Sequence, residues 1–158
     1  LGAQSINTVV AKALPELLSA GFNIIHAVGQ NNKLPESVPG YAPLSYITNM
    51  ADMYIASDLV ISRGGAVTCA ELDAANSYAL IVPLLIGNGE QVANAQDLVD
   101  KGAARICLNS EFTSEWLLSN IESLALAADN WNIKRVAGAK SRAAELIGSR
   151  VLQKVSGK

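Results

Sequence analysis

Apolar positions along the chain alternate between a helical spacing and short, nearly continuous runs. In residues 5–19 the apolar side chains recur every three or four positions, which predicts a helix that stops at Gly21. Pro15 falls within this pattern, and a proline inside a helix predicts a kink. Residues 22–28 form a short apolar run that predicts a strand, whereas residues 29–40 hold Gly, Asn, Pro and Ser, which predict a loop.

The rest of the chain repeats this alternation. Further strands are predicted at residues 41–46, 58–62, 79–83 and 103–108. Further helices are predicted at residues 49–56, 66–75 and 90–101, from Thr113 onwards, and at residues 132–154. Asn76 is expected to close the helix at residues 66–75 in left-handed geometry. Strands separated by helices imply βαβ units, so we expect an α/β fold: a Rossmann-like, doubly wound, mostly parallel sheet with helices on both faces. No repeat or linker interrupts the pattern, so residues 1–158 are expected to form one domain.

The composition fits a folded domain and excludes several classes of protein. The 158 residues are 50% hydrophobic and 16% charged, with a net charge of -2, which argues against disorder and against a basic nucleic-acid-binding surface. No run of about 18 apolar residues is present to span a membrane, and the first residues lack the features of a signal peptide. Cys69 and Cys107 lie in apolar segments, so we expect buried, reduced thiols and a cytoplasmic location. No Cys, His and carboxylate cluster has metal-ligand spacing, so no metal and no cofactor are expected.

The junction between the strand at residues 58–62 and the following helix holds the first candidate site. Gly64 and Gly65 permit the backbone to approach a ligand closely. The amides of Ala66, Val67 and Thr68 then lie at a helix N-terminus, where unpaired donors and partial positive charge suit a diphosphate. The alternative is that the glycine pair only makes a tight turn.

Glu71 follows about one turn into the same helix. A carboxylate repels phosphate, so it is expected to face a ribose diol, whose hydroxyl hydrogens it accepts. The alternative is a solvated helix residue.

A second junction lies between residues 84 and 95. Gly87 and Gly89 make its loop adaptable, and Gln91 and Asn94 are three residues apart, so they share a helix face. Neutral amides both donate and accept hydrogen bonds, which suits sugar hydroxyls. The alternative is a polar first helical turn without a ligand.

Two further residues have chemistry that a site uses. His26 is the only histidine and lies in a predicted strand without a visible Ser, Cys or Asp partner, so a structural role is favoured over that of a general base. Arg63 is expected to contact either a phosphate or a nearby carboxylate. The basic residues near the C-terminus are interpreted as a solvated helix face.

Several segments, in order, match a known family. They are residues 1–4, 26–29, 46–50, 62–71, 82–83 and 91–95. The most specific reads Ser-Arg-Gly-Gly-Ala-Val-Thr-Cys-Ala-Glu, and it resembles the Ser-Arg-Ser/Gly-Gly-Ala-x-Thr-x-x-Glu motif of the peptidoglycan N-acetylglucosaminyltransferases that make lipid II. The chain is similar to the carboxyl-terminal, donor-binding domain of that family over nearly its whole length.

The resemblance implies one half of a GT-B glycosyltransferase that transfers N-acetylglucosamine from UDP-N-acetylglucosamine to lipid I. The family's amino-terminal domain, which binds lipid I, is absent, and so are the residues that activate the acceptor. Peripheral contact with the cytoplasmic face of the bacterial membrane is implied, without a nucleic-acid partner.

The resemblance also implies roles for particular residues. Ile47 would contact uracil through its backbone and Glu71 would hold the ribose. Gly65 belongs to the turn before the diphosphate amides of residues 66–68, and Gln91 and Asn94 would reach the sugar. Glu90 replaces the family's usual glutamine, so one sugar contact differs, because an ionised carboxylate donates no hydrogen bond.

Three readings of the activity stay open. The first is the lipid I transferase. The second is a stand-alone donor-binding subunit of a split UDP-N-acetylglucosamine transferase. The third is a related UDP-sugar epimerase or glycolipid transferase.

Overall fold

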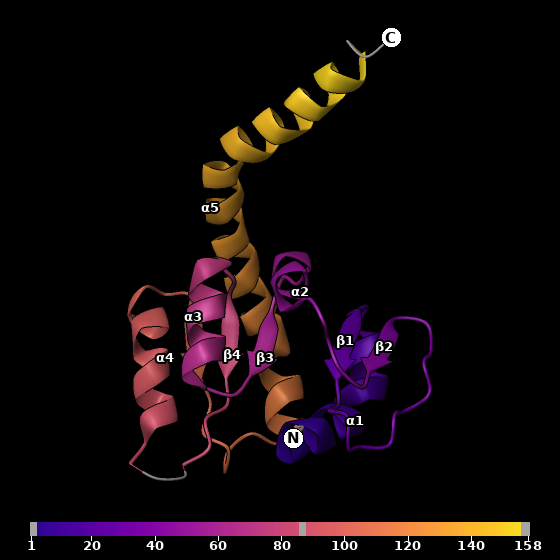
Figure 1. Ribbon diagram of the computed structural model, residues 1–158. Coiled ribbons are helices and arrows are strands. Elements are labelled where there is room, and N and C mark those ends of the chain that lie inside the picture. The colour runs from indigo at the N-terminus through magenta and orange to yellow at the C-terminus, as the bar shows by residue number, and fades with distance from the viewer. Residues whose placement is uncertain (1–2, 86–87, 156–158) are drawn as a thin grey trace.

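The computed structural model describes residues 3–85 and 88–155, with side-chain surroundings given as far as Arg135. Its elements run in the order α1 (Gln4–Ser19), β1 (Ile24–Ala27), β2 (Tyr41–Leu44), α2 (Met50–Ala56), β3 (Val60–Ser62), α3 (Ala66–Ala74), β4 (Ala79–Ile81), α4 (Glu90–Asp100), β5 (Ala104–Ile106) and α5 (Ser114–Val155). Figure 1 shows helices packed around two groups of strands. The predicted α/β class and the order of elements are confirmed.

All paired strands are parallel, as expected, but they form two sheets rather than one. The strand β1 pairs with β2, and β4 lies between β3 and β5. A loop, rather than a helix, joins β1 to β2, and α2 then carries the chain to the second sheet. Within the described residues no strand pairing links β1 to β3, so the sheets are held together by the helices packed on them.

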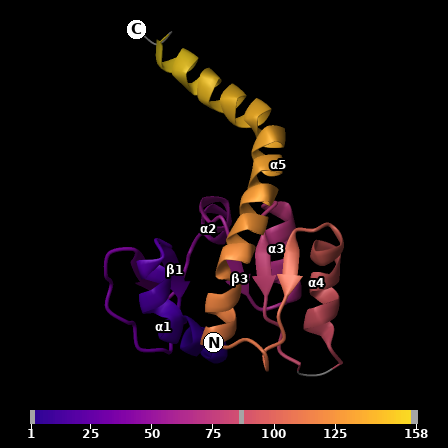
Figure 2. The ribbon, with the colours of Figure 1, turned by 180° about the vertical axis from the view of Figure 1, so that it is seen from behind.

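Helices cover both faces of the second sheet, as the doubly wound fold requires. Side chains of β4 and its next residue alternate between the faces: Leu80 and Val82 pack with α1 and the start of α5, whereas Ala79 and Ile81 pack with α2, α3 and α4. All four are fully buried. Figure 2 shows α5 crossing the back of the sheet on the side opposite α3. Continuous apolar strands are typical of a parallel sheet buried on both faces.

One expectation about the helices needs correction, and another is confirmed. The helix predicted from Thr113 and the one predicted at residues 132–154 form a single helix, α5, because no glycine or proline separates them. Pro15 lies inside α1 without ending it, on the exposed side of the helix, and the kink expected there stays a prediction. Asn76 has a φ of 50°, so it closes α3 as predicted.

Both cysteines are free and buried, as predicted. Over the described residues, no helix combines the length and the apolar character that a membrane span needs.

Candidate functional site

Helices α1, α3 and α4 begin at the same edge of the molecule, the lower edge in Figure 1, where the parallel strands β3, β4 and β5 end. None of the three has a side chain that caps its first turn. The helix α2 differs, because the Asn49 side chain accepts a hydrogen bond from the Asp52 amide. An uncapped helix start leaves backbone N–H groups available to a ligand.

The start of α3 has the geometry that the sequence predicted for an anion site. Gly65 is the N-cap residue in an extended conformation, and the first helical bond runs from the Cys69 amide to the Gly65 carbonyl, over 2.9 Å. The amides of residues 66–68 therefore have no acceptor within the helix. Val67 is 72% exposed, so this turn is open to solvent.

The two glycines before α3 have different structural reasons. A Cβ at Gly64 would collide with the backbone carbonyl of Gln91, so Gly64 permits α4, rather than a ligand, to approach the turn. A Cβ at Gly65 would meet only the Thr68 hydroxyl oxygen, at 3.7 Å. Gly64 therefore has a packing role against α4, whereas the space beside Gly65 is open; the approach of a ligand to this turn stays a prediction.

Glu71 lies on α3 one turn beyond Val67 and Thr68, where residues three or four apart share a helix face. Its Oε2 accepts a hydrogen bond of 3.0 Å from the hydroxyl of Tyr54, a side chain of α2 that is only 3% exposed. Burial, and then the hydrogen bond to the Glu71 carboxylate, raise the pKa of Tyr54, so its phenol stays protonated and donates. Sequence reasoning missed Tyr54, because only the packing of α2 on α3 brings the two residues together.

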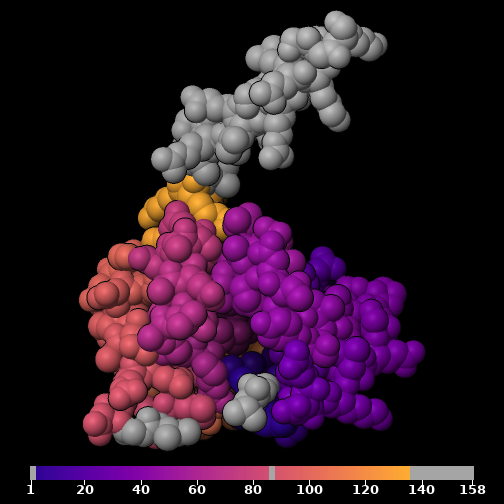
Figure 3. All heavy atoms as spheres, viewed as in Figure 1, coloured from indigo at the N-terminus to yellow at the C-terminus, as the bar shows by residue number. Residues whose placement is uncertain are grey.

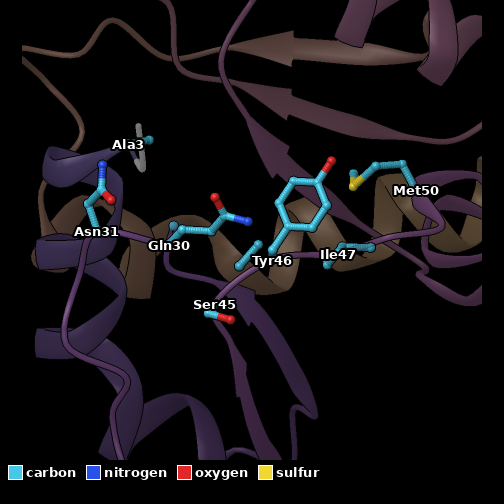
Figure 4. A pocket seen from close by; sticks show the side chains of 9 residues that line it. Ala3, Gln30, Asn31, Ser45, Tyr46, Ile47 and Met50 are labelled. Atoms are coloured by element: carbon cyan, nitrogen blue, oxygen red, sulfur yellow. The ribbon is translucent and has the colours of Figure 1, made fainter.

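A pocket of about 360 Å³ lies where β1 and β2 end and α2 begins. Its lining is formed by Ala3, Ala27, Gly29, Gln30, Asn31, Ser45, Tyr46, Ile47 and Met50. Figure 4 shows the Tyr46 side chain in the middle of the pocket, between Gln30 and Met50, and in Figure 3 the surface is hollowed between the β1–β2 side and α3. Ile47 therefore lines a pocket, and its contact with a base stays a prediction.

The helix α2 connects this pocket to Glu71. Met50, its first residue, lines the pocket, and Tyr54, four residues later on the same face, bonds Glu71. Ile47 and Glu71 therefore lie near opposite ends of one short helix.

Gln91 and Asn94 bond to backbone groups of the neighbouring loops. The Gln91 Oε1 accepts from the Leu84 amide at 2.9 Å, and the Asn94 Nδ2 donates to the Gly64 carbonyl at 3.0 Å. Each amide keeps its other polar group, so each has one hydrogen-bonding group left for a ligand. Asn94 thus ties α4 to the turn before α3, and Gln91 ties it to the loop after β4.

Arg63 pairs with no carboxylate within the described residues, and its contact with a phosphate stays a prediction. Its guanidinium donates to the Val82 carbonyl at 2.8 Å, to the Asn109 Oδ1 at 2.7 Å and to the hydroxyl of Ser5. Partial burial lowers its pKa, but an arginine remains charged at neutral pH. Arg63 thus links the start of α1 to the ends of β4 and β5, and the carboxylate alternative is wrong.

His26 is structural, as predicted. It is 8% exposed, and its Nδ1 and Nε2 lie 3.0 Å from the Tyr41 hydroxyl and 2.9 Å from the Asn7 Oδ1. The amide nitrogen of Asn7 donates to the Val28 carbonyl, so its oxygen faces His26, which places the imidazole proton on Nε2. Burial lowers the pKa of His26, and the neutral ring ties α1 to the first sheet.

No group of three His, Cys, Asp or Glu side chains gathers to hold a metal ion in the part of the chain that the structure describes. The expectation of no metal stays a prediction.

Comparison with known proteins identifies relatives over most of the chain. The family model described as the glycosyltransferase family 28 C-terminal domain matches residues 1–149. The UDP-N-acetylglucosamine--N-acetylmuramyl-(pentapeptide) pyrophosphoryl-undecaprenol N-acetylglucosamine transferase of Corynebacterium glutamicum (strain R) is 45% identical over 117 residues, which are 74% of this chain and 33% of that protein. The transferase of the same name from Streptomyces coelicolor is 41% identical over 154 residues, 94% of this chain and 41% of that protein.

Solved structures agree with this assignment. The crystal structure of Acinetobacter baumannii MurG has a TM-score of 0.68 and 33% identity, and the match covers 81% of this chain and 42% of that one. The glycotransferase of kitacinnamycin has a TM-score of 0.58 at 19% identity, which shows a shared fold alone. The chain spans less than half of the length of each of these relatives.

Proposed function

The chain belongs to the glycosyltransferase family 28 C-terminal domain, and from this premise we propose that it is the UDP-N-acetylglucosamine-binding half of an inverting transferase. The acceptor is lipid I and the product is lipid II. The proposal is supported by relatives that are 41% to 45% identical and whose names describe this transfer. It depends on one structural observation: the uncapped start of α3, with Glu71 one turn further along the same helix.

The donor would lie along the carboxyl edge of the strands, with each part matched to a chemical group. Uracil would enter the pocket beside Ile47, the ribose diol would bond Glu71, and the diphosphate would accept from the amides after Gly65. The free amide groups of Gln91 and Asn94 would bond the sugar. The distance along α3 from Ala66 to Glu71 is about 7.5 Å at a rise of about 1.5 Å per residue, so the diphosphate and the ribose would lie at separate points along one helix.

The helix start would also assist the reaction. As the bond from the sugar to the diphosphate breaks, negative charge grows on the β-phosphate oxygen. Backbone amides fixed at a helix N-terminus stabilise that charge more in the transition state than in the ground state, which lowers the barrier. The acceptor hydroxyl attacks from the opposite face of the sugar, and a second domain would supply the group that takes its proton.

The remaining partners follow from the same proposal. Lipid I would be bound by an N-terminal domain, and the complete enzyme would contact the cytoplasmic face of the membrane peripherally. Since the chain spans only 33% to 41% of its curated relatives, we expect it to produce no lipid II by itself. Turnover of lipid I by the isolated chain would overturn the division of labour between the domains.

Calorimetric titration of the chain with UDP-N-acetylglucosamine, UDP-glucose, UDP and ADP tests the proposal. We expect the three uridine nucleotides to bind, ADP to bind more weakly, and the N-acetylated sugar to bind more tightly than glucose. If the chain binds none of these nucleotides, or binds ADP with the same affinity as UDP, it has no site specific for uridine nucleotides.

Glu71→Ala provides a sharper test on a complete relative that carries these residues. We expect UDP binding to weaken by about 1–3 kcal/mol through the loss of charge-assisted hydrogen bonds. Asp73→Ala is the matched control, because Asp73 lies on the same helix but pairs with Lys101 at 2.7 Å. Equal affinities for the two variants would remove Glu71 from the site.

A further inference from the structure

Tyr54 is a buried residue whose hydroxyl bonds a residue on the surface. Its ring belongs to the core cluster that includes Cys69, Leu72 and Ile81, and only 3% of the residue is exposed. Its hydroxyl nevertheless donates a hydrogen bond to the carboxylate of Glu71, which is an exposed residue. A buried side chain therefore holds a surface carboxylate from below.

The position of Tyr54 is itself fixed by the protein. The hydroxyl of Ser77, which is 1% exposed, donates to the Tyr54 backbone carbonyl at 3.0 Å. This bond joins the short helix α2 to the turn after α3, so the elements carrying Tyr54 and Glu71 are fixed relative to each other. The phenol oxygen of Tyr54 is therefore held in a fixed position relative to α3.

Fixing the carboxylate has a consequence for ligand binding. An exposed glutamate samples several rotamers. When a ligand needs one of them, the loss of side-chain entropy opposes binding. The Tyr54 hydroxyl occupies one lone pair of Oε2, so the other lone pair and both lone pairs of Oε1 are left. A vicinal diol supplies two donors, which match those acceptors.

We propose that Tyr54 is a positioning residue that fixes the Glu71 carboxylate for the ribose diol of the nucleotide. This inference rests on the proposed function, since it assumes that a nucleotide binds here. Tyr54 itself touches no ligand in this arrangement and acts only through Glu71. Burial and the neighbouring carboxylate raise the pKa of Tyr54, so the phenol donates at every pH at which a binding assay is run.

The test compares UDP with 2′,3′-dideoxy-UDP, which lacks the diol but keeps the base and the diphosphate. The unmodified chain and Tyr54→Phe are titrated with both nucleotides by calorimetry. We expect Tyr54→Phe to lower the affinity for UDP roughly three- to tenfold, the range for one lost hydrogen bond, and to leave the affinity for dideoxy-UDP unchanged. Because the ratio is taken within each variant, a partial loss of folded protein does not alter it.

Tyr78→Phe is the matched control, because Tyr78 is also buried, at 7% exposure, and the charged group that influences its hydroxyl is Arg105 rather than Glu71. We expect its UDP to dideoxy-UDP ratio to equal that of the unmodified chain. A fourth protein, Glu71→Ala, should lose the preference for UDP, and adding Tyr54→Phe to it should lower the ratio no further, since both substitutions remove the same contact.

The outcomes separate this inference from the proposed function. If the unmodified chain binds no uridine nucleotide, the proposed function fails first. If it prefers UDP over dideoxy-UDP and Tyr54→Phe keeps the same ratio, the nucleotide site stands and the positioning role of Tyr54 is wrong. A further loss of the ratio in the double variant would also contradict it, because Tyr54 would then act on the diol independently of Glu71.

Discussion

Gly64 and Gly65 are neighbours, yet the structure predicts opposite effects for an alanine at each. Gly64→Ala places a methyl group against the Gln91 carbonyl, and the carbonyl carbon lies 3.0 Å from the new atom. The methyl group is attached directly to the backbone and the carbonyl is part of it, so neither can rotate away. The helix α4 must therefore move away from the turn before α3. That shift breaks the bond from Asn94 to the Gly64 carbonyl and strains the bond from Gln91 to the Leu84 amide.

The size of the effect follows from these contacts. Overpacking of this kind costs about 1–3 kcal/mol, and one lost hydrogen bond adds about 1 kcal/mol, so we expect Gly64→Ala to destabilise the chain by about 2–4 kcal/mol. For a domain of this size that corresponds to a fall in melting temperature of roughly 4–16 °C. Gly65→Ala meets only ordinary contact, and its φ of −66° and ψ of 145° suit alanine, so we expect a change within about 0.5 kcal/mol.

The assay combines thermal unfolding with titration of UDP. Gly64→Ala should lower the melting temperature, whereas Gly65→Ala should keep it and weaken UDP binding by at least about fivefold, because its methyl group enters the space proposed for the diphosphate. Equal melting temperatures for the two variants would refute the packing argument. A normal UDP affinity in Gly65→Ala would refute the placement of the diphosphate.

Three other substitutions test the contacts around the site. Because burial lowers the pKa of His26 below 6.5, its stabilising effect is complete above about pH 7 and is lost as the pH falls through 6.5 toward the lower pKa of the folded state. The difference in melting temperature between the unmodified chain and His26→Gln should therefore shrink between about pH 7.5 and about pH 5.5. A constant difference would show that His26 does not titrate in this range. Arg63→Met removes three hydrogen bonds and should destabilise the chain by roughly 2–4 kcal/mol in urea, whereas a phosphate-binding Arg63 would change UDP affinity instead. Asn94→Ala should cost about 1 kcal/mol of stability and also weaken UDP-N-acetylglucosamine more than UDP; an equal loss for both ligands would exclude a sugar contact.

Local chemistry in the sequence determined most of the fold and indicated where a candidate site lies. Helical periodicity, turn residues and short apolar runs predicted the strands and helices in order, apart from the division of α5 into two helices, because these patterns depend on neighbours within one or two turns. The glycines before Ala66 and the exposed position of Glu71 likewise indicated an open helix start. A helix N-terminus is a local structure, so its unpaired amides are readable from the chain alone.

Tertiary structure decided which partners each polar group found. The sequence left a carboxylate open as the partner of Arg63, but folding places Val82, Asn109 and Ser5 around it instead, up to 58 residues away along the chain. The split of the strands into two sheets is also a tertiary result, because pairing depends on which strands meet in space. Tyr54 reaches Glu71 only because α2 packs across α3. Hydrogen bonds between distant residues depend on the relative placement of whole elements, and no short pattern in the sequence encodes that placement.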